Sequence, residues 1–338
     1  MKAIVLNQKI YKLEIKDVDK PIISNSAVLV KLKAASLNHH ELWTLKEKKL
    51  SNDSNIILGS DGAGIIVSVG ANVKGLKEGD EVVINPSLNW GTNSKVHGGN
   101  YEILGFPKHG TFAEYISINQ QYVYHKPEHL SFEEAAALPL AGLTAYRALF
   151  TRGEFEKGNK ILINGIGGGV ALFVLSFAVA LGAKVYVTSG NDHKILKAIE
   201  LGAKGGVNYK ESNWSAKLLQ MTNGFDVIVD SAAGEGFKEL TEMTNPGARI
   251  ALLGRTAGNI QNLSPSIIFW KQISIHGTTM GSNEEFKKMI TFISSEKIRP
   301  VIDSIYSIQD INLAFDKMAK GEQFGKIVIN MDKFNNDI

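Results

Sequence analysis

Two adjacent histidines and a glutamate follow an apolar, strand-like run in the stretch KAASLNHHELW, residues 33–43. Imidazole and carboxylate groups are zinc ligands, so this stretch raises the question of a metal site. His39 and His40 would point to opposite faces of an extended segment and could not hold one ion. The chain has no cysteine, which excludes thiolate zinc sites, iron–sulfur clusters, disulfides and a cysteine nucleophile. We therefore expect no metal.

The remaining histidines do not form a ligand set either. His125 and His129 have helical spacing, but Pro127 between them argues against a helix. We expect His97 and His109 to be exposed on the surface.

A glycine-rich turn follows another apolar run in KILINGIGGGVALFVLSFAVALGAKVYVTSG. Strand, turn and apolar helix in this order are the context that the dinucleotide-binding fingerprint requires. The pattern G-x-G-x-x-G fails from Gly165, because Val170 occupies its sixth position. The spacing that fits is Gly165, Gly168 and Ala171, with the helix beginning near Gly169 and Val170. We expect the free N–H groups at this helix start to bind the cofactor's pyrophosphate.

The end of the next strand indicates which nicotinamide cofactor binds. An NAD site usually has a carboxylate about 20 residues after the turn, where it holds the ribose hydroxyls. Here the strand KVYVT leads into Ser189 and Asn191, and the nearest acid, Asp192, is placed to cap the next helix. Lys194 follows two residues later. Small polar side chains with a lysine suit the 2′-phosphate of NADP(H), which we expect as the cofactor.

Two patterns divide the chain into regions that would position these residues. Up to about residue 135, short alternating runs such as AVLVKLKAA and GAGIIVSVG are broken by Gly, Asn and Pro, which predicts a β-rich unit. From about Ser131 the pattern becomes helical, in FEEAAALPLAGLTAYRALF. From Lys160 to about Thr278, β-type runs alternate with helical stretches, which predicts an α/β unit with a doubly wound parallel sheet. The last part of the chain holds two amphipathic helices and the strand GKIVIN.

Composition excludes several classes of function. Hydrophobic residues make up 44% of the chain and charged residues 21%, and no apolar run is long enough to span a bilayer. The net charge of +3 is small and the basic residues are scattered among acids, so we expect neither a nucleic-acid nor a membrane partner. The opening residues, MKAIVLNQKIYKLEIKDV, predict a strand and not a signal peptide, and we expect a cytoplasmic location.

Taken together, these motifs resemble the medium-chain dehydrogenase/reductase superfamily over essentially the whole chain. The resemblance rests on LKAASLNHHEL, LGSDGAGIIVSVG, GDEVVINP, GTFAEYI, SFEEAAALPLAGLTAYRAL, NGIGGGVA and GKIVI. The zinc-dependent alcohol dehydrogenases of this family would have a cysteine at Asn38 and a histidine at Ser60. Where they often carry a structural zinc lobe with four cysteines, this chain has SLNWGTNSKVHGGNYEILGFPKHG. Asn38, GSD and LPLAGLTAY instead resemble the zinc-free quinone oxidoreductases.

The resemblance implies a GroES-like catalytic domain, residues 1–135 and 281–338, around a Rossmann domain, residues 136–280. It also implies a homodimer made by pairing the strand ISIHGTT with its copy. The resemblance further implies that Thr144 contacts the nicotinamide and that the turn at Gly254 lies near the nicotinamide ribose. The residues implied around the adenosine phosphate are Ser189, Asn191, Lys194 and Tyr209.

Hydride transfer to a conjugated acceptor is the chemistry that needs a metal least. Zinc polarises a carbonyl as a Lewis acid, and reduction of an isolated ketone loses that stabilisation without it. In a quinone or an enone, the charge spreads to an oxygen that the Asn38 amide or backbone N–H groups could hold. The proton can come from water. Trp43 and Leu140 would form apolar walls for a flat small-molecule substrate.

Three functions stay open on this basis. The sequence favours an NADPH-dependent reductase of quinones or α,β-unsaturated carbonyls. The second is an alcohol dehydrogenase with rebuilt metal ligands, for which Asp61 and His39 or His40 are the only candidates. The third is a non-catalytic NADPH-binding sensor or structural protein.

Overall fold

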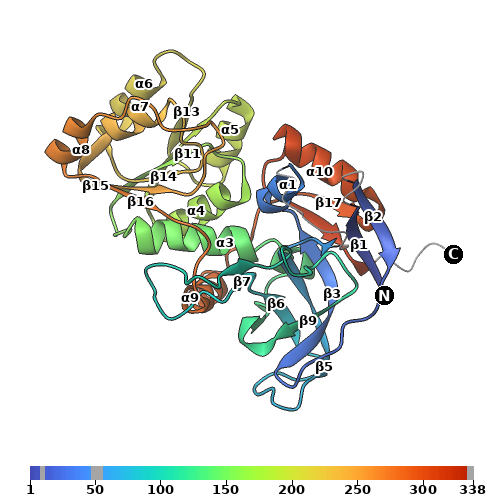
Figure 1. Cartoon of the computed structure of the whole chain (residues 1–338). Coiled ribbons are helices and arrows are strands. Elements are labelled where there is room, and N and C mark those ends of the chain that lie inside the picture. Colours follow the sequence, from blue (N-terminus) through green and yellow to red (C-terminus); the bar gives the residue numbers. More distant parts are fainter. Residues whose placement is uncertain (8–11, 47–55, 333–338) are drawn as a thin grey trace. The chain divides into compact units, whose positions relative to one another are not determined.

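The computed structural model describes residues 1–7, 12–46 and 56–332 of the chain (Figure 1). These residues form two compact units, Met1–Ala141 with Gly281–Ile338, and Gly142–Met280. The change of sequence pattern near residue 135 precedes the first division at Ala141, which falls inside helix α3 (Pro139–Tyr146). No helix in the described ranges is long and apolar enough to cross a membrane.

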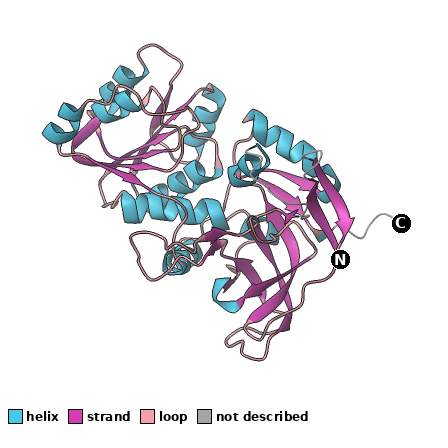
Figure 2. Cartoon of the chain, in the orientation of Figure 1, coloured by secondary structure: helices cyan, strands magenta, loops and turns pink. Residues whose placement is uncertain are grey.

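The first unit is built mainly of antiparallel strands (Figure 2). Its largest sheet has the order β10-β6-β5-β3-β18-β17, with β9 also pairing with β3, and a second sheet has the order β2-β1-β4. The strands are β1 (Lys2–Asn7), β2 (Lys12–Asp17), β3 (Ala27–Ser36), β4 (Ile56–Ile57), β5 (Asp61–Val69), β6 (Glu81–Ile84), β7 (Ser87–Leu88), β8 (Glu102–Ile103), β9 (Tyr115–Asn119), β10 (Val123–His125), β17 (Ile302–Ser307) and β18 (Lys326–Asn330).

Helices accompany the strands of this unit. They are α1 (His39–Lys46), α2 (Phe132–Ala136), α9 (Asn283–Ser295) and α10 (Ile311–Lys320). Helix α1 was not expected from the sequence, whereas α9 and α10 are the two amphipathic helices expected in the last part of the chain. Ser131 and Ser282 begin α2 and α9 with capping boxes, in which serine and glutamate satisfy the free N–H groups of the first turn. Helix α10 contacts β17 and β18 and closes one side of the apolar core (Figure 1).

Strand β3 is the centre of the first unit. Its sequence AVLVKLKAAS is buried along most of its length, as expected of a strand with neighbours on both edges. It pairs antiparallel with β5, where Ser36 lies opposite Asp61, and with β18, where Ser36 lies opposite Val328. The C-terminal strand is thereby brought beside residues near position 36, although almost 300 residues separate them in the chain.

The second unit contains a parallel six-stranded sheet of order β13-β12-β11-β14-β15-β16. This order, 3-2-1-4-5-6 in chain order, is that of a Rossmann sheet and confirms the predicted doubly wound fold. The strands are β11 (Lys160–Asn164), β12 (Lys184–Ser189), β13 (Gly205–Asn208), β14 (Phe225–Asp230), β15 (Thr244–Leu252) and β16 (Ser274–Gly277). The helices after α3 are α4 (Gly169–Ala180), α5 (Asp192–Glu200), α6 (Trp214–Thr222), α7 (Phe237–Glu242) and α8 (Pro265–Lys271).

Candidate functional site

The glycine turn after β11 has the geometry of an anion-binding loop. Gly165 and Gly167 have φ angles of +86° and +136°, a region that side chains other than glycine rarely adopt. Gly168 is the N-cap residue of α4. The first N–H groups of a helix have no intrahelical partner, and no side chain caps them here. A Cβ built on Gly168 would meet nothing within 4 Å, so the space in front of the helix is open. These features fit a cofactor pyrophosphate.

A buried hydrogen-bond network holds this turn against the ends of three strands. The N–H of Gly165 donates to Thr188 Oγ1 at 3.0 Å, and that hydroxyl donates to Asn164 Oδ1 at 2.6 Å. The Asn164 amide in turn donates to Asp230 at 2.8 Å. Burial raises the pKa of Asp230, although N–H donors from Asn164, Ala232 and Ala233 oppose that effect. The turn is therefore positioned by polar groups that the glycine pattern does not reveal.

The end of β12 supplies small polar groups, as the sequence predicts, but the helix cap is a different residue. Asn191, and not Asp192, is the N-cap of α5, and its side chain accepts from the N–H of His193 at 2.9 Å. Asp192 is the first helical residue and accepts from the Asn208 amide at 2.9 Å. Ser189 is buried, and its hydroxyl accepts from the Asn191 N–H at 3.2 Å.

Two cationic side chains lie near these turns. A Cβ built on Gly167 would lie 3.3 Å from Lys194 Nζ, so Lys194 reaches across the glycine turn. A Cβ built on Gly190 would lie 2.8 Å from the Tyr209 hydroxyl and 2.9 Å from Lys210 Cε. Lys210 was not identified from the sequence, because it lies beyond the end of β13 in a turn with no motif of its own.

Thr144 and Gly254 lie in the second unit as well. Thr144 is buried in α3, with its hydroxyl 3.7 Å from Met280 Sδ. Gly254 follows β15, and a Cβ there would lie 2.5 Å from the backbone oxygen of Ser231, so a side chain does not fit. The second unit thus contains all the residues predicted to contact the cofactor, and their individual contacts with it stay predictions.

In the first unit, Asn38 belongs to a buried polar cluster with Lys326 at its centre. The Lys326 ammonium donates to the backbone oxygen of Leu37 at 2.7 Å, to Asn38 Oδ1 at 2.5 Å and to Asp61 Oδ2 at 3.0 Å. Lys326 is 4% exposed and Asp61 is fully buried. All three ammonium hydrogens therefore have an acceptor, which is the condition for burying a lysine.

Asp61 is saturated with donors. Its Oδ2 accepts from Ser36 Oγ at 2.9 Å and from Asn38 Nδ2 at 2.9 Å, in addition to the ammonium. Its Oδ1 accepts from the backbone N–H of Leu140 at 2.8 Å. The start of helix α3 is thereby fixed to the cluster.

Glu41 forms the second half of the cluster. Its carboxylate accepts from the Asn38 N–H at 2.8 Å, from the Ser60 N–H at 2.9 Å and from the Ser60 hydroxyl. Burial is the main cause that raises the pKa of Glu41, and Asp61 adds to the effect; His40, the Ser60 hydrogen bond and Lys326 oppose it. In the sequence Glu41 stands out only as a neighbour of the histidines, and its role as an acceptor for Asn38 and Ser60 depends on the fold.

The Asn38 carboxamide has one orientation in this network. Its oxygen accepts from Lys326 and one of its hydrogens is directed to Asp61. The other faces Ser60 Oγ at 3.4 Å, longer than the usual range for a hydrogen bond from nitrogen. This second N–H is the group that could serve a substrate oxygen, and the oxyanion role of Asn38 stays a prediction.

Zinc does not fit this set of residues. The family's two ligand positions hold an amide and a hydroxyl, both already hydrogen-bonded. The Lys326 ammonium lies against Asp61, the carboxylate that accepts from the Asn38 side chain. Across residues 1–7, 12–46 and 56–332, no group of three or more metal-binding side chains is placed to hold an ion.

The histidines are arranged differently from the sequence expectation but lead to the same conclusion. His39 and His40 begin helix α1 and are not in an extended segment, so their side chains diverge around a helix. His125 ends β10 and no helix joins it to His129, as Pro127 predicts. His97 and His109 are exposed, also as predicted.

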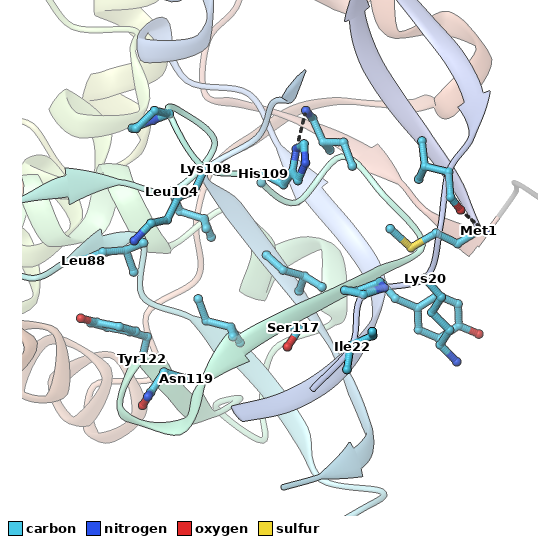
Figure 3. A pocket seen from close by; sticks show the side chains of 18 of the residues that line it. Met1, Lys20, Ile22, Leu88, Leu104, Lys108, His109, Ser117, Asn119 and Tyr122 are labelled. Atoms are coloured by element: carbon cyan, nitrogen blue, oxygen red, sulfur yellow. Dashed lines mark hydrogen bonds between the residues drawn. The ribbon is translucent and has the colours of Figure 1, made fainter. Parts of the chain in front are cut away.

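Trp43 and Leu140, the predicted pocket walls, are both partly accessible. Trp43 lies on α1 and is 38% exposed, and Leu140 is half-buried beside Asp61 through its backbone. A groove of about 940 Å³ lies elsewhere in the first unit, lined in part by Lys20, His109 and Tyr122 (Figure 3). None of the predicted site residues lines this groove.

The comparisons with known proteins agree with both units. Residues 24–128 match the alcohol dehydrogenase GroES-like domain, and residues 169–295 match the zinc-binding dehydrogenase family. The chain is 35% identical to the zinc-type alcohol dehydrogenase-like protein YogA of Leptosphaeria maculans, with 96% of each chain covered. The chain belongs to the medium-chain dehydrogenase/reductase superfamily.

Two further relatives show how varied this superfamily is. A 2-methylene-furan-3-one reductase of Solanum lycopersicum is 33% identical, over 95% of this chain and 76% of the relative. A crystal structure of an NAD-dependent alcohol dehydrogenase superposes with a TM-score of 0.91 and 33% identity, covering 98% of this chain and 99% of the other. This member of the superfamily is therefore an NAD(P)-dependent oxidoreductase with a GroES-like and a Rossmann unit.

Proposed function

We propose that this protein is a metal-independent reductase that transfers hydride from NADPH to a quinone or an α,β-unsaturated carbonyl compound. The observation that carries the proposal is the Lys326 ammonium, which donates to Asn38 Oδ1 and Asp61 Oδ2. A divalent cation bound at Asn38 would lie against this positive charge. It would also compete with an ammonium for oxygens that are already hydrogen-bonded.

The choice of substrate follows from what this cluster offers in place of a Lewis acid. Reduction of a saturated ketone, or oxidation of an alcohol, needs strong polarisation of the substrate oxygen. In zinc-dependent relatives the metal ion supplies that polarisation. A conjugated acceptor spreads the developing charge, so that one or two neutral N–H donors stabilise it. The reductase from tomato acts, by its name, on a ketone conjugated to a methylene group, which is a compound of this class.

The proposed reaction requires little proton chemistry from the protein. When bound, NADPH supplies the hydride. In an enone the β-carbon accepts it, the pair of the carbon–carbon double bond shifts to join the α-carbon to the carbonyl carbon, and the carbonyl π pair moves to the oxygen. The α-carbon of the resulting enolate then takes a proton from water, which leaves hydroxide and the saturated carbonyl product. The Asn38 N–H that faces Ser60 holds the oxygen while it is negatively charged. Trp43 and Leu140 orient the flat substrate through apolar contacts.

A preference for NADPH is supported by charge at the end of β12. Asn191 occupies the cap of α5 and Asp192 is hydrogen-bonded to Asn208, so no carboxylate is presented at the strand end itself. Lys194 and Lys210 lie close to Gly167 and Gly190. A doubly charged 2′-phosphate would gain charge-assisted hydrogen bonds from such lysines.

A homodimer through β16 is part of the proposal. In the parallel sheet β16 is the last strand and pairs only with β15 among the described strands, which leaves one edge for a second copy. Phe269 and Trp270 on the preceding helix are 60% and 79% exposed. Exposed large apolar side chains in the same unit favour association.

A steady-state screen with NADPH against quinones, enones, aldehydes and saturated ketones tests the proposed function. We expect turnover of the first two classes and little or none of the last two. Turnover confined to alcohols and saturated carbonyls would support the metal-dependent dehydrogenase instead. Tight NADPH binding without turnover of any acceptor would support the non-catalytic alternative.

A further inference from the structure

We propose that Lys326 is a positioning residue, whose ammonium fixes and polarises the Asn38 carboxamide so that its N–H groups face away from the lysine. The inference follows from geometry within the first unit. Its catalytic consequence rests on the proposed function, in which the Asn38 amide holds the substrate oxygen.

The sheet places the two residues opposite each other. The register of β18 against β3 pairs Val328 with Ser36, and continuing it by two residues brings Lys326 opposite Asn38. A hydrogen bond of 3.0 Å from the Leu37 N–H to the Ile327 oxygen extends the ladder in this direction. The contact is thus a product of strand pairing and does not depend on a flexible loop.

The ammonium selects one of the two orientations that a carboxamide can adopt. As placed, the Asn38 oxygen faces Lys326 Nζ at 2.5 Å and the Asn38 nitrogen faces Asp61 Oδ2 at 2.9 Å. A rotation by 180° would set the NH₂ group against the ammonium and the oxygen against the carboxylate. Both contacts would then be repulsive, so the charged pair holds the amide in one state.

The same contact strengthens the amide as a donor. An ammonium that donates to the amide oxygen draws electron density away from the NH₂ group, and hydrogen bonds in such a chain reinforce one another. The hydrogen that faces Ser60 at 3.4 Å is therefore held in a fixed direction and made more positive. Lys326 itself is buried and acts through Asn38.

The alternative is that Lys326 only neutralises Asp61, to which it also donates. A neutralising lysine would stabilise the fold without controlling the Asn38 amide. The two roles differ in what happens to the Asn38 side chain when the charge is removed, and that difference can be observed directly.

The first arm of the test is an NMR measurement that needs no turnover. Protein labelled with ¹⁵N at asparagine is compared as wild type and as Lys326→Met, with Asn38→Ala used to assign the Asn38 side-chain signal. In the wild type we expect Asn38 side-chain protons with chemical shifts far from those of a free carboxamide and slow exchange with water. In Lys326→Met we expect shifts close to the free values and lines broadened by rotation of the carboxamide about χ2. Lys33→Met removes an accessible lysine of β3 paired with Asp332, and should leave the Asn38 signal unchanged.

The second arm is a double-mutant cycle on turnover of an acceptor found in the screen. We expect Lys326→Met to lower kcat about tenfold with little change in KM or in NADPH affinity. In an Asn38→Ala background the same substitution should have almost no further effect. A chain without activity on any acceptor would refute the proposed function, and the NMR arm would still decide the role of Lys326.

Removing Lys326 alone could prevent folding, because Asp61 would stay buried without its counter-charge. Lys326→Met combined with Asp61→Asn removes the opposite charges together and serves as the second variant for both arms. An Asn38 amide signal that is the same in wild type and in the Lys326 variants would overturn the inference. Independent, multiplying effects of the Lys326 and Asn38 substitutions on kcat would also overturn it.

Discussion

Lys326 Nζ lies 2.5 Å from the side-chain oxygen of Asn38. Asn38 occupies one of the two positions where zinc-dependent relatives have a metal ligand. The buried cluster around this contact contains two carboxylates, Asp61 and Glu41, and one ammonium. Each of these groups is hydrogen-bonded inside the cluster. The positive charge in this cluster is therefore the Lys326 ammonium and not a bound metal ion.

Lys194 should determine the choice between the two nicotinamide cofactors. We expect Lys194→Ala to weaken NADPH binding by about 1.5–3 kcal/mol and NADH binding much less, because only NADPH carries the 2′-phosphate. Dissociation constants from fluorescence titration give both values. Lys197→Ala in the same helix is the matched control and should retain the preference for NADPH. Equal affinities of the wild type for both cofactors would refute this assignment.

Gly168 should be required for cofactor binding but not for folding. Its φ of −82° suits any residue, and the space around its Cβ position is open, so Gly168→Val should fold normally. The added branch would occupy the space where the pyrophosphate must approach the helix. We expect cooperative thermal unfolding without the rise in Tm that NADPH gives the wild type.

Gly236 provides the control for that substitution. It also has a negative φ and open space at its Cβ position, at the start of α7. Gly236→Val should keep the NADPH-induced rise in Tm. If Gly168→Val binds NADPH as tightly as the wild type does, the pyrophosphate lies elsewhere.

Glu41 should make stability depend on pH. Because burial raises its pKa, the folded chain binds the Glu41 proton more tightly than the unfolded chain does. Its contribution is fully present below the pKa of the unfolded glutamate and is lost as the pH rises through the higher, folded pKa. In urea unfolding at a series of pH values, we expect Glu41→Gln to remove this decline. Glu200→Gln, at an exposed site on α5, should keep it; an unchanged slope in Glu41→Gln would contradict the assignment.

The open edge of β16 should form the dimer contact. Ile275→Pro removes a backbone donor in the middle of this strand and should convert the dimer to a monomer, as measured by light scattering after size-exclusion chromatography. Exposed Ile22 lies in the other unit, and Ile22→Ser should leave the mass unchanged. A wild-type chain that is monomeric at all concentrations would exclude the dimer.

The sequence was sufficient for the architecture because the relevant signals are local. The alternation of β-type and helical runs predicted the parallel sheet, and the glycine turn predicted the strand, loop and helix at residues 160–180. The helix at His39 was missed because NHHELWTLK has almost no amphipathic pattern. Its first turn is fixed by Glu41, which accepts from the nearby Asn38 N–H and from the distant Ser60 N–H. The expected cap of α5, Asp192, is one residue away from the observed cap, Asn191, because both residue types cap helices and they are adjacent in the sequence.

The chemical centre of the first unit could not be predicted, because it depends on contacts between distant parts of the chain. Lys326 stands in the strand GKIVIN, where a lysine after a glycine suggests a solvated strand end. Its burial requires the pairing of β18 with β3, and its function depends on Asn38 and Asp61, which are 288 and 265 residues away. Local sequence patterns hold no information on that register.

Metal analysis of protein purified without added metal, combined with turnover of a quinone or enone before and after chelation, decides whether the reaction depends on zinc. We expect zinc far below one ion per chain, and NADPH-dependent turnover that neither a chelator nor added zinc changes. Asn38→Ala should lower that turnover about ten- to a hundredfold. One zinc per chain, with activity lost on chelation and restored by zinc, would refute metal-independent reduction and identify a metal-dependent dehydrogenase.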